Sequence, residues 1–204
     1  MAASGEVREH APASAAITAF VENHARVELQ VNRRRRLQAD LAGIQPEEWT
    51  AHFNTSYYDG LWSGVALRTT EGAHVPLYPD PGKRTYVDLD VLKRCPYIGQ
   101  VLAAFHCPLQ LVRLLKLSPG SNIKEHRDYN LSYEDGEVRI HIPVQTNPAV
   151  EFAVEGKPLA MGERECWYIN FNLPHRIHNR GATDRVHLVI DCVLNDWLRG
   201  MFPQ

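Results

Sequence analysis

The segment Glu137–Val144, with the sequence EVRIHIPV, alternates strictly between apolar and polar positions. Residues two apart in an extended strand point to the same face. The alternation therefore predicts a β-strand with an apolar face and an opposite face that carries Arg139 and His141. Two such side chains turned inward would need an anion or a metal, because a buried unpaired charge is very costly.

Other segments have the same strand character. Val150 to Val154 alternates again, and two apolar runs are bounded by turn residues. The predicted strands are 62–68, 109–117, 137–144, 150–154, 166–171 and 185–194, and the last two are separated by a loop rich in Pro, Asn and Gly. Several short strands with turns between them predict a mainly β protein, a sandwich or small barrel, rather than alternating βαβ units.

Helices are predicted mainly in the first half of the chain. Apolar residues at helical spacing run from Ala11 to about Gly43, and Gln45–Trp49 has the start signals of a short helix. Asp88 is a candidate cap for a helix beginning near Leu89, and a further helix is expected over Ile98–Phe105. We expect residues 1–10 to be disordered, 11–45 to form an N-terminal helical segment, and 46–204 to form the β-domain, within a single domain overall.

Composition excludes several classes of partner. The 204 residues carry 22 Lys and Arg against 24 Asp and Glu, a net charge of -2, so no overall field recruits nucleic acid or a membrane. The run Arg33–Arg36 is interpreted as a solvated helix face. The absence of a basic, apolar leader and of a long apolar run predicts a cytoplasmic protein. The four cysteines contain no C-x-x-C pair, and Cys166 and Cys192, which lie in apolar strand-like runs, are expected to be buried free thiols.

Three residues have the types and spacing of a metal site. His126 and Asp128 are two apart in a stretch taken as extended, so both side chains lie on one side, and His175 follows a proline. Two histidines and one carboxylate on one face of a metal are typical of non-haem Fe(II) oxygenases. Arg185, ten residues further on, could hold the far carboxylate of a 2-oxo acid. His178 is the alternative to His175.

These residues lie within a longer resemblance. It is carried by LSPG at 117–120, EHRDY at 125–129, VRIHI at 138–142, LPH at 173–175 and DRVHLVID at 184–191. Over roughly residues 109–198 the chain resembles the aspartyl/asparaginyl β-hydroxylase family of Fe(II)/2-oxoglutarate-dependent oxygenases. The presence of Asp128 makes it more similar to the bacterial branch, which includes proline cis-4-hydroxylases, than to the animal members that lack this carboxylate.

The resemblance implies a fold, cofactors and roles. The fold is a double-stranded β-helix (jelly roll, cupin-like) core with N-terminal α-helices packed outside. The cofactors are Fe(II), the cosubstrate 2-oxoglutarate and O2. The metal ligands and catalytic residues are His126, Asp128 and His175. Arg185 binds 2-oxoglutarate, with Arg139 and His141 assisting. The implied reaction hydroxylates an unactivated C–H bond of an amino acid and releases succinate and CO2.

Alternatives remain open at this stage. A cupin-like metal-binding protein that is an isomerase or a small-ligand sensor would share the barrel and the histidines but would not need Arg185. An interaction module would leave the polar strand faces unexplained. The expected partner is a small-molecule or peptide substrate, with no nucleic acid and no membrane, and the oligomeric state is open. The candidate substrate-pocket residues are Tyr57, Tyr58, Trp62 and Arg68, although an aromatic cluster of this kind is more often part of a core.

Overall fold

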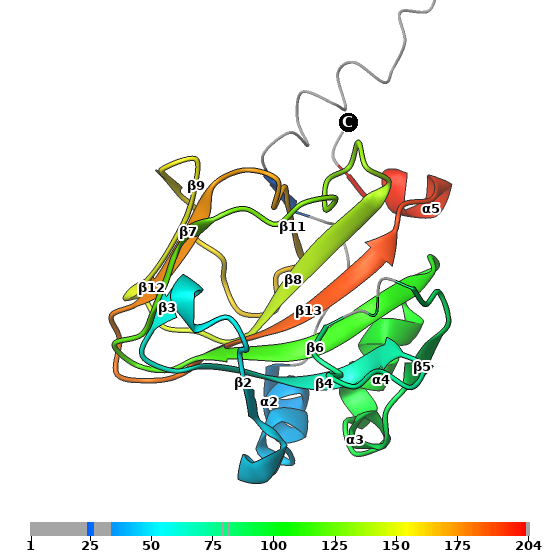
Figure 1. Cartoon of the computed structure of the whole chain (residues 1–204), viewed down its shortest axis with the longest axis horizontal. Helices are drawn as coiled ribbons and strands as arrows, with labels where there is room; N and C mark the ends of the chain where they lie inside the picture. The colour runs from blue at the N-terminus through cyan, green and yellow to red at the C-terminus, as the bar shows by residue number, and fades with distance from the viewer. Residues whose placement is uncertain (1–23, 27–33, 79, 81, 203–204) are drawn as a thin grey trace, which may run out of the picture.

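Two antiparallel β-sheets form the framework of the computed structural model, which describes residues 24–26, 34–78, 80 and 82–202 (Figure 1). The main sheet has, in order, β1 (His24–Arg26), β11 (Trp167–Ile169), β8 (Glu137–Gln145), β13 (Arg185–Val193), β6 (Leu109–Leu117), β4 (Trp62–Thr70) and β2 (Thr50–Ala51), and β5 (Tyr86–Asp88) pairs with β4. The second sheet has β10 (Lys157–Pro158), β9 (Val150–Val154), β12 (His175–Asn179), β7 (Asn122–His126) and β3 (Tyr58–Asp59).

The chain passes back and forth between the two sheets. From β6 to β9 successive strands alternate between the main sheet and the second sheet, and β11, β12 and β13 alternate again. This is how a jelly roll places two sheets face to face around one interior. The predicted mainly β, jelly-roll fold is confirmed.

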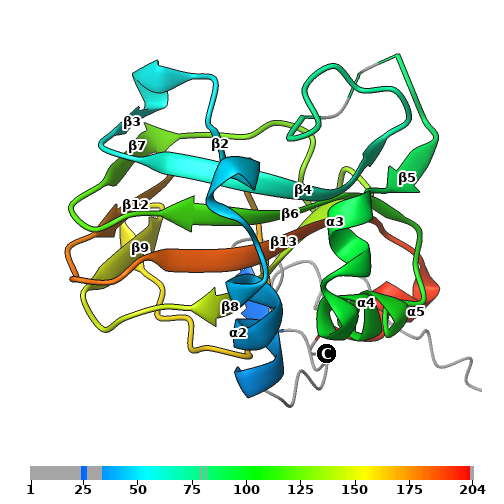
Figure 2. The ribbon, with the colours of Figure 1, turned by 90° about the horizontal axis from the view of Figure 1, so that it is seen from below.

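The helices are short. They are α2 (Arg34–Ala42), η1 (Pro46–Glu48), η2 (Thr55–Tyr57), α3 (Asp90–Lys93), α4 (Pro96–Ala103) and α5 (Asp196–Arg199). Figure 2 shows α2, α3 and α4 on the outer face of the main sheet, away from the second sheet. None of the helices among these residues is long and apolar enough to cross a bilayer.

Side chains alternate between the two faces of β8 and β13, so the main sheet packs against a different core on each face. The apolar side chains of these strands, such as Ile140 and Leu188, pack with Leu37 of α2 and Ile98 of α4 in the outer core. The opposite faces turn toward the second sheet, where Phe152, Phe171 and their neighbours form an inner core. Eight of the nine residues of β13 are buried. The polar faces of both strands therefore line the interior.

Most predicted strands are confirmed, and three local predictions are wrong. His24–Arg26 were predicted to be helical but pair with β11 as a strand; the predicted disorder of 1–10 and the rest of 11–33 lie outside the described residues. The loop predicted after residue 171 contains β12, which gains order by pairing with both β7 and β9. Asp88 ends β5, and Leu89 is the residue that precedes the first turn of α3.

Two further predictions are confirmed for the residues that the structure describes, which exclude Arg33 and the side chain of Arg34. Arg35 and Arg36 are exposed, and the Arg36 guanidinium lies 5.6 Å from the centre of the Tyr97 ring. All four cysteines are free thiols, and Cys166 and Cys192 are buried.

Candidate metal centre

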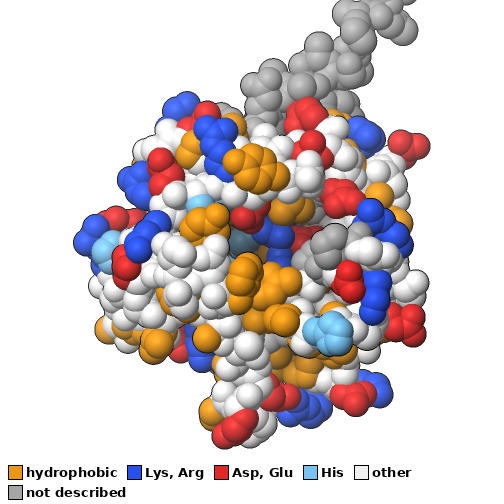
Figure 3. Space-filling model, viewed as in Figure 1, with side chains coloured by type: hydrophobic (Ala, Val, Ile, Leu, Met, Phe, Trp, Pro, Cys, Tyr) orange, Lys and Arg blue, Asp and Glu red, His pale blue; other side chains and the backbone are white. Residues whose placement is uncertain are grey.

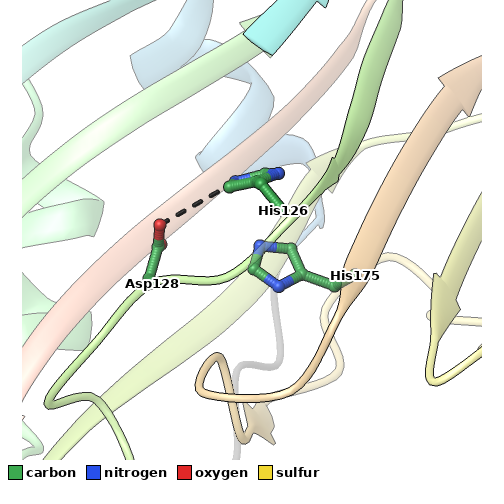
Figure 4. Close-up of side chains that lie close together, drawn as sticks. All are labelled: His126, Asp128 and His175. Carbon is green, nitrogen blue, oxygen red and sulfur yellow. Dashed lines mark ion pairs between the residues drawn. The ribbon is translucent and has the colours of Figure 1, made fainter.

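Strands β7 and β12 bring the two histidines together. His126 ends β7, and its Cα partner across the ladder is His175, the first residue of β12. The centres of their imidazole rings are 4.2 Å apart. Asp128 follows β7, where its backbone N–H donates to the Phe171 carbonyl at 2.9 Å. One ligand atom from each of the three side chains lies within 4.8 Å of the others (Figure 4).

Hydrogen bonds orient both imidazoles of the candidate site. His126 Nδ1 lies 2.8 Å from the Lys124 carbonyl oxygen, and His175 Nδ1 lies 2.9 Å from that of Leu173. A carbonyl oxygen only accepts, so each Nδ1 carries the hydrogen and each Nε2 keeps a lone pair. Burial lowers the pKa of His175 to about 4, so that this imidazole is neutral at neutral pH. The donor set fits a divalent transition metal.

Arg139 holds the Asp128 carboxylate in place. Its Nη1 donates to Asp128 Oδ2 at 2.6 Å, while its Nε and Nη2 donate to the two oxygens of Asp191 at 2.6 and 3.0 Å. Burial raises the pKa of Asp128, but the positive charge of Arg139 is the largest opposing effect, and the pKa is lowered overall. Asp128 is therefore an anion at neutral pH.

Arg185 is a buried cation in the same interior. It begins β13 and is 2% exposed. Its Nη2 donates to His187 Nδ1 at 2.9 Å, and its Nε has no partner. Among the described residues, no carboxylate pairs with Arg185. Burial lowers its pKa to about 9, so it is still charged at neutral pH.

His141 lies in the same interior and contacts Phe171 and His187. Its ring stacks on Phe171 with centres 4.9 Å apart, and its Nδ1 is 3.2 Å from His187 Nδ1. Because Arg185 already donates to that His187 nitrogen, the His141 Nδ1 must carry the hydrogen of this contact. The buried His141 Nε2 has no partner. The roles predicted for Arg139 and His141 in binding 2-oxoglutarate stay predictions.

One cavity is lined by the three candidate ligands and by Arg113, Arg139 and Arg185. It has a volume of about 260 Å³. Figure 3 shows its mouth as a hollow with basic atoms in the floor and hydrophobic side chains along the rim. The lining residues are His52, Phe53, Tyr57, Trp62, Leu77, Tyr78, Arg113, Leu115, Ile123, His126, Asp128, Arg139, His141, Phe171, His175, Ile177 and Arg185.

Only some of the residues predicted to form the substrate pocket line this cavity. Tyr57 and Trp62 line it, and Tyr58 packs edge-on against Trp62 with ring centres 5.7 Å apart. Arg68 is not part of it, and that prediction is wrong: its guanidinium is bound by the Asp88 carboxylate and the Tyr86 carbonyl at the outer edge of β4. His178 is not among the lining residues either.

Sequence reasoning missed the pairing of two buried charges. Arg113 lies in the apolar run of β6, and its Nη2 donates to Asp191 on β13 at 3.0 Å. Both residues are 5% exposed. An Arg at the centre of a mostly apolar strand was the available signal, because such a cation needs a buried partner.

The fold and the site together define a jelly-roll protein with a centre of two histidines and one carboxylate. The sequence model of the aspartyl/asparaginyl beta-hydroxylase family matches residues 29–194. The chain belongs to this family.

Two relatives illustrate the likeness. L-proline cis-4-hydroxylase of Rhizobium meliloti (strain 1021) is 27% identical over 161 residues, which cover 76% of this chain and 56% of that protein. The chain thus spans little more than half the length of this relative. An oxidoreductase of the 2OG-Fe(II) oxygenase family from Burkholderia pseudomallei aligns over 93% of both chains, with a TM-score of 0.57 and 15% identity, which is a likeness of fold.

Proposed function

We propose that this protein is an Fe(II)- and 2-oxoglutarate-dependent dioxygenase that hydroxylates an unactivated C–H bond of an amino acid, free or peptide-bound. When bound, Fe(II), 2-oxoglutarate and O2 supply the oxidising chemistry, with release of succinate and CO2. Membership of the aspartyl/asparaginyl β-hydroxylase family and the likeness to a proline hydroxylase support this function.

The observation that carries the proposal is the position of Arg185. A metal site alone would suit many jelly-roll proteins. Here the same cavity also holds a buried guanidinium that no carboxylate neutralises among the described residues. Such a cation is costly unless an anion joins it. A dicarboxylate with one end at the metal and the other at Arg185 would supply that anion.

The residues of the chain then have distinct tasks. His126, Asp128 and His175 would hold Fe(II) through two nitrogens and one oxygen. Arg139 keeps Asp128 ionised and directs one of its oxygens away from the metal position. Arg185 would bind the distal carboxylate of 2-oxoglutarate through a planar fork that a lysine cannot reproduce.

The test is a screen for substrate-stimulated succinate. The protein with Fe(II), 2-oxoglutarate and O2 is offered free amino acids and short peptides, and products are analysed by mass spectrometry. We expect at least one compound to stimulate succinate formation and to gain one oxygen atom. Metal binding without 2-oxoglutarate binding or succinate formation would contradict the proposal and favour a cupin-like protein that is not an oxygenase.

A further inference from the structure

His52 is a hydrogen-bond donor in the cavity wall, and its neighbours fix its orientation. Its imidazole stacks on the Trp62 ring with centres 3.7 Å apart and planes 6° from parallel, and its backbone N–H donates to the Trp62 carbonyl at 2.9 Å. The Asn54 backbone N–H donates to His52 Nδ1 at 3.3 Å. A ring nitrogen that accepts carries no hydrogen, so the hydrogen of the neutral His52 imidazole is on Nε2. This Nε2–H has no acceptor among the described residues.

The imidazole of His52 is uncharged and belongs to the same interior as the candidate metal centre. Burial lowers its pKa to about 4, and the positive charge of Arg113 lowers it further. His52 therefore presents one neutral N–H donor at neutral pH. It lines the same cavity as His126 and Asp128, and the charges of both residues act on its pKa.

Tyr78 provides a second donor on the same wall. Its ring meets that of His52 edge-on with centres 5.4 Å apart, and both side chains line the cavity. The Phe53 backbone N–H donates to the Tyr78 hydroxyl oxygen at 3.3 Å. That contact uses a lone pair of the oxygen, and the hydroxyl hydrogen has no acceptor among the described residues. Burial raises the pKa of Tyr78, so the hydroxyl keeps this hydrogen at neutral pH.

Two donors without acceptors favour a ligand atom that accepts. A ligand that displaces water from such groups loses their hydrogen bonds unless it brings an acceptor of its own. An oxygen has two lone pairs and can accept from both His52 and Tyr78. Because both donors are uncharged and packed against Trp62 and Phe53, they suit a neutral oxygen better than a carboxylate, whose desolvation they would not offset.

We infer that His52 and Tyr78 form a subsite that binds a neutral oxygen of the substrate, a hydroxyl or carboxamide oxygen, and that this subsite determines substrate specificity. The inference rests on the proposed function, because it takes the cavity of the metal centre as the place where the amino acid binds. It narrows the substrate class: the amino acid has a polar, uncharged side chain rather than a purely aliphatic one.

The test compares pairs of amino acids of similar shape that differ in this oxygen. The pairs are L-threonine with L-valine, L-homoserine with L-norvaline, and L-glutamine with L-methionine, each as the free acid and as the N-acetyl amide. Binding to the protein loaded with Fe(II) and 2-oxoglutarate, without O2, is measured by isothermal titration calorimetry. We expect the polar member of at least one pair to bind about 10-fold more tightly, the effect of two neutral hydrogen bonds. Equal binding within every pair would overturn the inference, as would no binding by any compound.

Variants that remove one donor each tie the preference to the two residues. His52→Phe keeps a ring on Trp62 without the N–H, and Tyr78→Phe removes the hydroxyl. Each should weaken binding of the polar member about 3-fold and leave that of its apolar partner unchanged, and the double variant should abolish the preference. Tyr86→Phe, at a tyrosine of β5 outside the cavity, is the control.

The apolar partner separates a binding role from a structural one. If His52 and Tyr78 only supported the wall, their replacement would weaken both members of a pair equally. That result would overturn the inference, as would a preference preserved in the double variant.

The proposed function is checked separately in every variant by direct titration of Fe(II) and 2-oxoglutarate. If the wild-type protein binds neither, the proposed function fails. If it binds both but does not discriminate within the pairs, only the subsite of His52 and Tyr78 fails.

Discussion

Arg139 Nη1 lies 2.6 Å from Oδ2 of Asp128, and Nε and Nη2 of the same guanidinium donate to the two oxygens of Asp191. Asp128, the proposed metal ligand, is thereby connected to a buried carboxylate on the central strand β13. Groups that orient a ligand in this way commonly contribute 10- to 100-fold to metal affinity.

We predict that Asp191→Asn weakens Fe(II) binding by roughly 10- to 100-fold. The amide cannot neutralise Arg139 and Arg113, so both guanidiniums would compete for Asp128 and pull it from the metal. Metal titration measures the affinity, and the visible spectrum of the Co(II)-loaded protein reports the coordination. Asp90→Asn, at an exposed aspartate of α3, is the control. Unchanged affinity and spectrum in Asp191→Asn would refute the positioning role.

The choice between two histidines of β12 gives a second prediction. His126→Ala or His175→Ala should abolish Fe(II) retention, because each removes one of three ligands. His178→Ala should retain the metal, since His178 lies on the same strand but not at the cavity. The iron content per protein chain, measured by inductively coupled plasma mass spectrometry, shows which of the two histidines is the ligand. Loss in His178→Ala with retention in His175→Ala would reverse the assignment.

The metal-free protein should lose stability in mild acid. Burial lowers the pKa of His175 to about 4 and the pKa values of His141 and His187 well below their ordinary value. Below about pH 6.5 the unfolded chain therefore binds more protons than the folded one, so the free energy of unfolding falls as pH falls toward 4. Each such imidazole contributes up to about 1.4 kcal/mol per pH unit.

Urea denaturation at a series of pH values from 7 to 4.5 measures this slope. His187→Gln should make it shallower, whereas His74→Gln, at an exposed histidine, should not change it. A stability that is flat over this range would contradict the assignment of neutral, buried imidazoles.

The sequence predicted the elements whose pattern is long and regular. Leu109–Leu117 coincides with β6, and the alternation of Glu137–Val144 gives β8 to within one residue. Strand β12, with the sequence HRIHN, has too little apolar character to stand out, and its order comes from pairing with strands on both sides. Such tertiary stabilisation cannot be predicted from a local pattern.

The site was predicted where its parts are close in sequence or have a fixed spacing, as in His126 and Asp128. The contact between Arg113 and Asp191 joins residues 78 positions apart, and no local pattern pairs them. The prediction that Arg68 lines the substrate pocket was wrong for the same reason, because its partner Asp88 lies on the neighbouring strand β5. Partners of buried charges depend on the register between strands, which the alternation alone does not determine.

The central claim is that Arg185 and the three metal ligands form one site for a metal and a 2-oxo acid. The most direct test measures both the KM for 2-oxoglutarate and the Fe(II) content of the Arg185→Leu variant. Arg180→Leu, at an exposed arginine, is the control. We predict a KM raised roughly 100-fold, the scale of a lost buried charge pair, at unchanged iron content. An unaltered KM, or a loss of iron that accounts for the whole effect, would contradict the account.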